Sequence, residues 1–173
     1  SLTGGRGAPG GGGGSARVPA FPAGVGAALD RRVRDLAFLA RAAQDGLVTE
    51  GTPLRVVVEF CTSEHYSRRH DTARYAELFE RLAGALHEQL SGRRFELLDN
   101  RVAAAAPPMD PRPGAFEVYV EWDDAGGRTH TVVLFSKLET MRYPRPAQVA
   151  ARLGALLAGN EDASGIADDD MLP

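Results

Sequence analysis

Hydrophobic residues recur along the middle of the chain with two different spacings, which predict alternating strands and helices. The stretch 54–60 reads LRVVVEF, a β-branched run typical of a strand covered on both faces. Residues 71–90 carry apolar side chains three or four positions apart, which predicts an amphipathic helix. Its expected buried stripe consists of Tyr75, Leu78, Phe79, Leu82, Leu86 and Leu90.

The next segment predicts a short strand, an irregular loop and a hairpin. RFELLD at 94–99 is the second strand, and four prolines between 107 and 113 exclude regular structure in the loop that follows. Residues 114–122 alternate between apolar and polar, and a turn at 123–127 leads into an antiparallel strand at 129–136. We expect Phe116, Val118, Val120 and Trp122 to face inward, and Glu117, Tyr119 and Glu121 to face outward.

A last helix is expected at 146–157, with Pro146 in its first turn. Its inward residues are Val149, Leu153, Leu156 and Leu157. The order is therefore a β-α-β unit, a β-hairpin and a final helix. This β-α-β-β-β-α order is the α/β, thioredoxin-like arrangement, in which one right-handed crossover is combined with an antiparallel hairpin.

The flanking segments differ from this core in composition. We divide the chain into a Gly/Pro-rich extension at 1–23, an amphipathic helix within 24–50, the thioredoxin-like domain at 51–158 and an acidic tail at 159–173. The helix either packs on its own domain or docks on another protein, and the sequence leaves both open. Since a glycine tract needs a surface to become ordered, we expect other protein subunits to contact residues 1–53, with the acidic tail as a second candidate.

Composition excludes several classes of partner. The net charge of −3 disfavours nucleic acid and anionic membranes, which select for a strongly basic face. No apolar run approaches the roughly 18 residues that a membrane-spanning helix needs. The chain has one cysteine, so an internal disulfide framework is impossible, and a reducing compartment is indicated.

That cysteine, Cys61, follows the first strand, where thiol redox chemistry is usually built as Cys-x-x-Cys. The fourth position is Glu64, so no second thiol can resolve a mixed disulfide, and dithiol oxidoreductase activity is excluded. Two readings stay open. Cys61 is either a monothiol redox group or a small apolar residue of the core.

Other candidate sites are weaker. Cys61, Glu64, His65 and His70 could offer four metal ligands, but their spacing matches no strong zinc pattern, so we predict no metal site. Nothing in the sequence brings Glu117 and Glu139 together as an acid pair. The glycines of 4–14 neither follow a strand nor open a helix, so no cofactor-binding loop is predicted.

Three stretches resemble the Rdx family, which is selenoprotein W/T/H-like, and especially its migration and invasion enhancer branch. They read VVVEFCTSEHY from 56, GAFEVYV from 114 and VLFSKLETMRYPRPAQVAARL from 133, and the similarity covers roughly residues 54–158. The resemblance implies a thioredoxin-like fold with Cys61 at the first redox position and Glu64 at the second. It also shows departures, because Met141 and Arg142 stand where the family usually has two glycines.

These observations favour a non-catalytic accessory or structural subunit of a larger assembly. The loss of the resolving position and the added terminal segments motivate this hypothesis. A mitochondrial complex is our expectation, because the chain starts without methionine and its N-terminal part is rich in arginine; the cytoplasm is the alternative. The alternative function is a monothiol redox or redox-sensing protein that uses Cys61. A membrane-peripheral adaptor is disfavoured, since the chain lacks the lipidated cysteine motif of the resembling branch.

Overall fold

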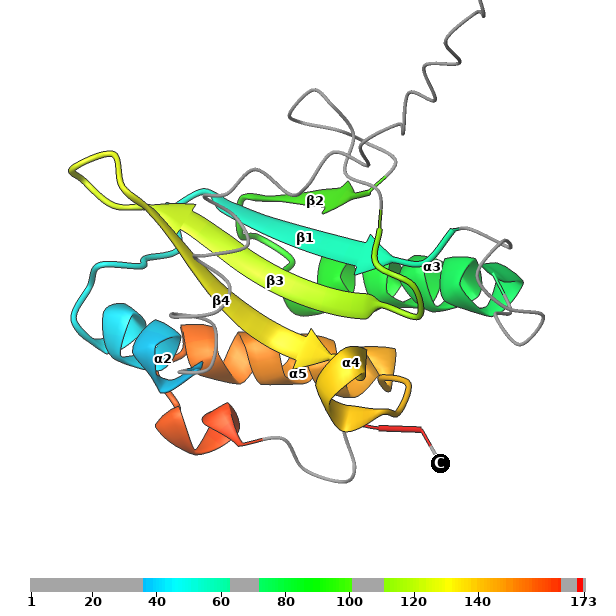
Figure 1. The fold of residues 1–173 in the computed structure, drawn as a ribbon. Coiled ribbons are helices and arrows are strands. Elements are labelled where there is room, and N and C mark those ends of the chain that lie inside the picture. Colours follow the sequence, from blue (N-terminus) through cyan, green and yellow to red (C-terminus); the bar gives the residue numbers. More distant parts are fainter. Residues whose placement is uncertain (1–35, 63–71, 101–110, 166–170, 173) are drawn as a thin grey trace, which may run out of the picture.

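The computed structural model describes residues 36–62, 72–100, 111–165 and 171–172, which form a mixed α/β domain (Figure 1). Its centre is a four-stranded sheet with the order β2-β1-β3-β4. The strands are β1 (Leu54–Phe60), β2 (Phe95–Asp99), β3 (Phe116–Asp123) and β4 (Thr129–Ser136). Strand β1 pairs in parallel with β2 and antiparallel with β3, which in turn pairs antiparallel with β4. The predicted thioredoxin-like class is confirmed.

Three helices cover one face of this sheet (Figure 1). They are α2 (Leu36–Gln44), α3 (Thr72–Gln89) and α5 (Pro146–Leu157). The apolar stripe predicted for α3 is buried, because Tyr75, Leu78, Phe79, Leu82 and Leu86 all belong to the core. The sheet contributes Val56, Val58, Phe60, Phe116, Val118, Val120, Trp122 and Val132 to the same core.

Helix α2 is part of this core. Leu36, Leu39, Ala40 and Ala42 are buried in it. The Gln44 side chain donates to the Gly159 carbonyl oxygen at 2.6 Å, and Arg41 approaches Glu161 at 3.4 Å. The sequence left open whether this helix packs on its own domain or docks on another protein. The described part of the helix packs on its own domain.

One face of β3 is more buried than the sequence indicates. Glu117 and Tyr119 lie on the face opposite the helices, as expected, but only 3% and 5% of their surface is exposed. These side chains meet polar partners on that face rather than water. Two short elements were not predicted either, the helix α4 (Lys137–Thr140) and the 3-10 helix η2 (Glu161–Ser164).

Several predicted features lie outside the described residues. They include the 1–23 extension, Glu64, His65, His70 and the aspartates of 168–170. No helix among the described residues is both long and apolar enough to cross a membrane.

Candidate functional site

Cys61 lies directly after β1, at the end of the sheet where the family motif begins. Only 1% of its surface is exposed, and it belongs to the apolar core. Its backbone N–H donates to the carbonyl oxygen of Ala115 at 3.0 Å, which extends the pairing of β1 with the β3 side by one residue. The next residue, Thr62, is exposed, and Glu64 lies outside the described residues.

A side chain secures the other side of this strand end. Asn100 follows β2, and its Oδ1 accepts from the Phe60 N–H at 3.1 Å. Its Nδ2 donates to the Phe60 carbonyl oxygen at 2.9 Å. The Asn100 side chain therefore makes the two hydrogen bonds that a residue of a neighbouring strand would make. The backbone next to Cys61 is thus held from both sides. The sequence alone did not predict this role of Asn100, because polar residues are common in turns and most of them make no such contact.

Tyr75 of α3 lies close to Cys61. The Tyr75 hydroxyl donates to the Gly114 carbonyl oxygen at 3.3 Å, and Lys137 Nζ donates to the same oxygen at 3.0 Å. Burial raises the pKa of Tyr75, the neighbouring Tyr143 raises it further, and a charge on Cys61 acts in the same direction. Tyr75 and Cys61 are thus within electrostatic reach of each other.

The ring of Tyr143 extends this cluster to the surface. Its centroid lies 5.7 Å from that of Tyr75. Arg74 lies 4.0 Å from the Tyr143 ring centroid, and Lys137 Nζ lies 4.9 Å from it, both at cation–π distance. Aromatic rings and side chains with long aliphatic stems therefore close the sheet end next to Cys61.

A second polar cluster lies on the sheet face opposite the helices. Glu59 of β1 is 1% exposed, yet both of its oxygens are paired. Arg112 Nε and Nη2 donate to them at 2.9 and 2.8 Å, and the Arg112 backbone N–H donates at 2.8 Å. The Tyr119 hydroxyl donates to Glu59 Oε2 at 3.1 Å. The hydrogen bond with Glu59 raises the pKa of Arg112, and burial raises that of Tyr119.

Glu117 is the cross-strand partner of Glu59. It accepts from the Leu138 N–H at 3.0 Å and from the Ser136 hydroxyl, whereas Arg112 Nη2 is 4.0 Å away. Burial raises the pKa of Glu117. The acid pair in this protein is therefore Glu59 and Glu117, whereas Glu139 is exposed. The sequence missed it because the pairing depends on the register of β1 and β3.

This polar cluster has the character of a structural core. Every buried side-chain nitrogen or oxygen among the described residues has a hydrogen-bond partner. The Glu59 carboxylate is fully engaged by Arg112 and Tyr119, so it offers no free base to a substrate. Within the same described part of the chain, no three His, Cys, Asp or Glu side chains gather where they could hold a metal ion.

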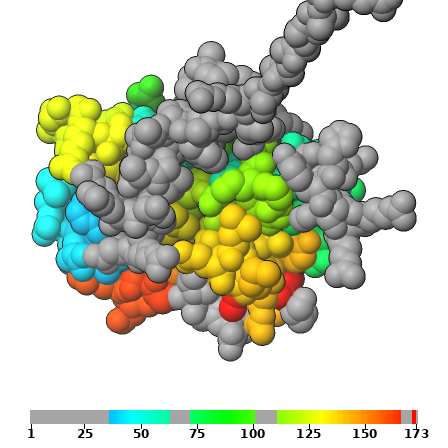
Figure 2. Space-filling view, in the orientation of Figure 1, coloured from blue at the N-terminus to red at the C-terminus, as the bar shows by residue number. Residues whose placement is uncertain are grey.

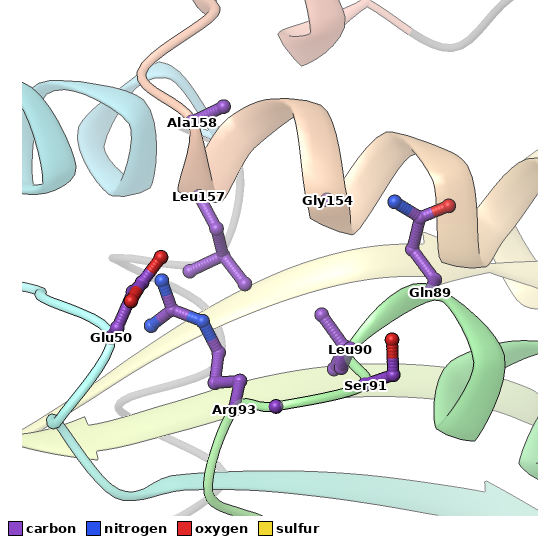
Figure 3. A pocket seen from close by; sticks show the side chains of 9 residues that line it. Glu50, Gln89, Leu90, Ser91, Arg93, Gly154, Leu157 and Ala158 are labelled. Carbon is purple, nitrogen blue, oxygen red and sulfur yellow. The ribbon is translucent and has the colours of Figure 1, made fainter.

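A hollow of about 390 Å³ lies where α3 and α5 end (Figure 3). Glu50, Gln89, Arg93 and Gly154 are among its lining residues, and Cys61 is not. Arg93 Nη1 donates to the Thr49 carbonyl oxygen at 2.6 Å. Burial lowers the pKa of Arg93, although the charge of Glu50 counteracts this. The hollow is polar.

Comparison with known proteins agrees with this geometry. The model of the Rdx family matches residues 55–155, which span the sheet and helices α3 and α5. No curated protein and no solved structure matched the chain. Strand, buried cysteine, hairpin and final helix thus occupy the matched segment in the expected order. The protein belongs to the Rdx family and contains its thioredoxin-like, redox-related domain.

Proposed function

We propose that this protein is a non-catalytic, thioredoxin-like accessory subunit of a larger protein assembly. One observation carries the proposal: the sole cysteine of the chain is buried, with 1% of its surface exposed. Disulfide exchange requires a thiolate that can reach an incoming sulfur atom, and then a second thiol to release the product. Cys61 lacks access in the described fold, and the chain has no second thiol.

The surroundings of Cys61 add to this argument. Asn100 and Ala115 hold the backbone on both sides of the strand end, and the buried sulfur reaches solvent only when the fold around it opens. The free energy of that opening reduces the reactive population of the thiol. Cys61 thus acts mainly as a small apolar residue that completes the core.

The proposed assembly role has separate support in the first 53 residues. Within them, Phe38 and Leu47 are large apolar side chains that stay 38% and 65% exposed. Phe38 also stacks on Trp122 with centroids 5.8 Å apart, which fixes it on the surface. A partner subunit that contacts residues 1–53 would bury both side chains. The mitochondrial location is part of this proposal and rests on the arginine-rich composition of the N-terminal part alone.

The alternative is a monothiol redox or redox-sensing function. It is favoured by membership of a redox-related family. In this case the Cys61 thiolate would attack the disulfide of an external molecule such as oxidised glutathione, forming a mixed disulfide and releasing one glutathione thiolate. A glutathione thiol would then attack the mixed disulfide and regenerate Cys61.

Thiol labelling separates the two functions. A small alkylating reagent is added to the full chain in buffer and in denaturing urea, and the two rates are compared. We expect Cys61 to react at least about 100-fold more slowly in the folded protein, because only locally opened molecules react. Fast labelling of the folded chain, together with loss of cellular function in both Cys61→Ser and a folded Cys61→Ala, would establish the redox function instead.

The assembly role is tested by affinity purification of the full chain from its native source. We expect co-purifying subunits, and we expect Leu47→Asp to release them. Met141→Asp is the matched control, because Met141 is also a large exposed apolar residue but lies outside residues 1–53. A monomeric native protein, or equal loss of partners with both variants, would contradict the proposal.

A further inference from the structure

Residues Met171 and Leu172 lie against the connection between α4 and α5 (Figures 1 and 2). Met171 forms an isolated antiparallel bridge with Pro144. The Leu172 N–H donates to the Tyr143 carbonyl oxygen at 2.7 Å, and Arg145 Nε donates to the Met171 carbonyl oxygen at 2.8 Å. A short extended segment is therefore bound through its backbone, as in peptide recognition by strand addition.

The receiving surface is apolar at its centre. Pro144 is buried, Tyr143 is half-buried, and Met171 and Leu172 pack against the main core. Met141, which is 80% exposed, lies two residues before Tyr143. The docking edge, defined here as Tyr143–Arg145, thus offers backbone groups and apolar surface to a two-residue apolar segment.

Basic side chains surround the same edge. Arg74 and Lys137 lie 4.0 and 4.9 Å from the centroid of the Tyr143 ring. Arg145 belongs to the docking edge, and Arg142 directly precedes it. In the sequence, three aspartates at 168–170 directly precede Met171. The sequence that precedes the bound residues therefore carries the charge opposite to that of the edge.

The contact is small enough to be displaced. Its polar part consists of the Leu172–Tyr143 hydrogen bond, which belongs to the bridge, and the Arg145–Met171 hydrogen bond. Removal of a single hydrogen bond changes such a population by about 2- to 10-fold. A segment held this weakly can exchange with a competing peptide of the same chemistry.

We propose that the Tyr143–Arg145 edge is a docking surface for an extended peptide in which acidic residues precede two apolar residues, and that Met171–Leu172 is its resident occupant. A second peptide of this kind would bind in place of the resident segment. The proposal is independent of the accessory function proposed above, because it requires neither an inert Cys61 nor contacts of residues 1–53.

The test uses Leu172→Pro in the full chain, since proline removes the N–H that donates to Tyr143. Leu172→Ala retains this N–H and serves as the control. A synthetic peptide with the sequence Asp-Asp-Asp-Met-Leu-Pro is titrated into each protein, and binding is followed by the NMR signals of Tyr143 and Arg145. We expect about 2- to 10-fold tighter binding to Leu172→Pro than to the unchanged protein, and weaker binding at high salt.

Two further comparisons keep the result clear. A peptide with proline in place of its leucine should bind about 2- to 10-fold more weakly, because it lacks the same N–H. If the Leu172→Pro protein does not fold, Met171→Ser weakens the resident contact instead, because it removes an apolar side chain of the bound segment and leaves the docking edge unchanged. Arg81→Met, on the outer face of α3, is the control and should bind the peptide like the unchanged protein. Equal peptide binding to all variants, shifts away from 143–145, or no binding to any variant would overturn the proposal.

Discussion

Arg112 holds both oxygens of the Glu59 carboxylate, although Glu59 is almost completely buried. Nε and Nη2 donate at 2.9 and 2.8 Å, so the contact is bidentate. The side chain of Arg112 itself is 42% exposed, which means that one partner of this ion pair remains hydrated. A partly exposed arginine therefore neutralises the charge of a carboxylate that is buried on the sheet.

Replacement of this arginine should destabilise the fold. Arg112→Met leaves Glu59 charged and buried, and we expect a loss of about 1.5–3 kcal/mol in the free energy of unfolding, reduced from the value for a fully buried pair because Arg112 is partly exposed. Urea denaturation measures the loss. Arg128→Met, on the hairpin, should change the stability by less than about 0.5 kcal/mol. If Arg112→Met with Glu59→Gln is no more stable than Arg112→Met alone, the explanation is wrong.

Glu117 should make stability depend on pH. Burial raises its pKa above the ordinary value of 4.5, so the folded state binds its proton more tightly than the unfolded state does. Its contribution to stability is therefore largest below pH 4.5 and falls as the pH rises from there through the raised pKa. Glu117→Gln should remove this decline, because the amide oxygen can still accept from Leu138. Urea denaturation at several pH values between 4 and 8 gives the difference.

The same series with Glu96→Gln is the control, since Glu96 is exposed on β2. Its stability curve should run parallel to that of the unchanged protein. A Glu117→Gln curve that also runs parallel would show that Glu117 does not titrate differently in the folded state.

Met141 should be replaceable by glycine with a gain in stability. It follows α4 with φ of +57°, a left-handed conformation in which side chains are disfavoured. Because the side chain is 80% exposed, little packing is lost. Met141→Gly should therefore raise the free energy of unfolding by about 0.5–1 kcal/mol. Thermal denaturation tests this, with Met141→Ala, which keeps the strain, as the comparison. A lower melting temperature for the glycine variant would contradict it.

Arg152 should be one of the most sensitive positions of α5. It is 6% exposed and donates to the carbonyl oxygens of Leu134, Ala163 and Ser164 at 3.2, 2.9 and 3.0 Å. Arg152→Met keeps the stem but removes these bonds, so we expect a loss of about 2–4 kcal/mol. Hydrogen exchange should locate the change at η2 and β4. Exchange that increases uniformly over the whole domain would argue against a local role.

Local patterns were sufficient to predict most of the elements. The strands at 54–60 and 129–136 and the helix at 146–157 have the bounds expected from the sequence. Each carries a continuous or periodic apolar signal that depends only on its own residues. The elements α4 and η2 were missed because four residues are too few to show such a period.

The polar clusters could not be predicted for a different reason. Glu59 and Glu117 look like solvent-facing residues when their strands are read singly. Their burial depends on Arg112, which lies 53 residues after Glu59. Likewise, the Asn100 side chain binds the Phe60 backbone only because the end of β2 lies beside Phe60. Such roles arise from tertiary contacts, and a residue's own neighbours in the sequence carry no sign of them.

The contacts of α2 with the end of the domain also have a consequence for folding. Arg41 and Glu161 are 120 residues apart in the chain, and Gln44 and Gly159 are 115 apart. During synthesis, the apolar face of α2 leaves the ribosome long before the helix and turn that cover it. We therefore expect folding to be slow for a domain of this size and to finish only after α5 has emerged, with molecular chaperones protecting the exposed face until then.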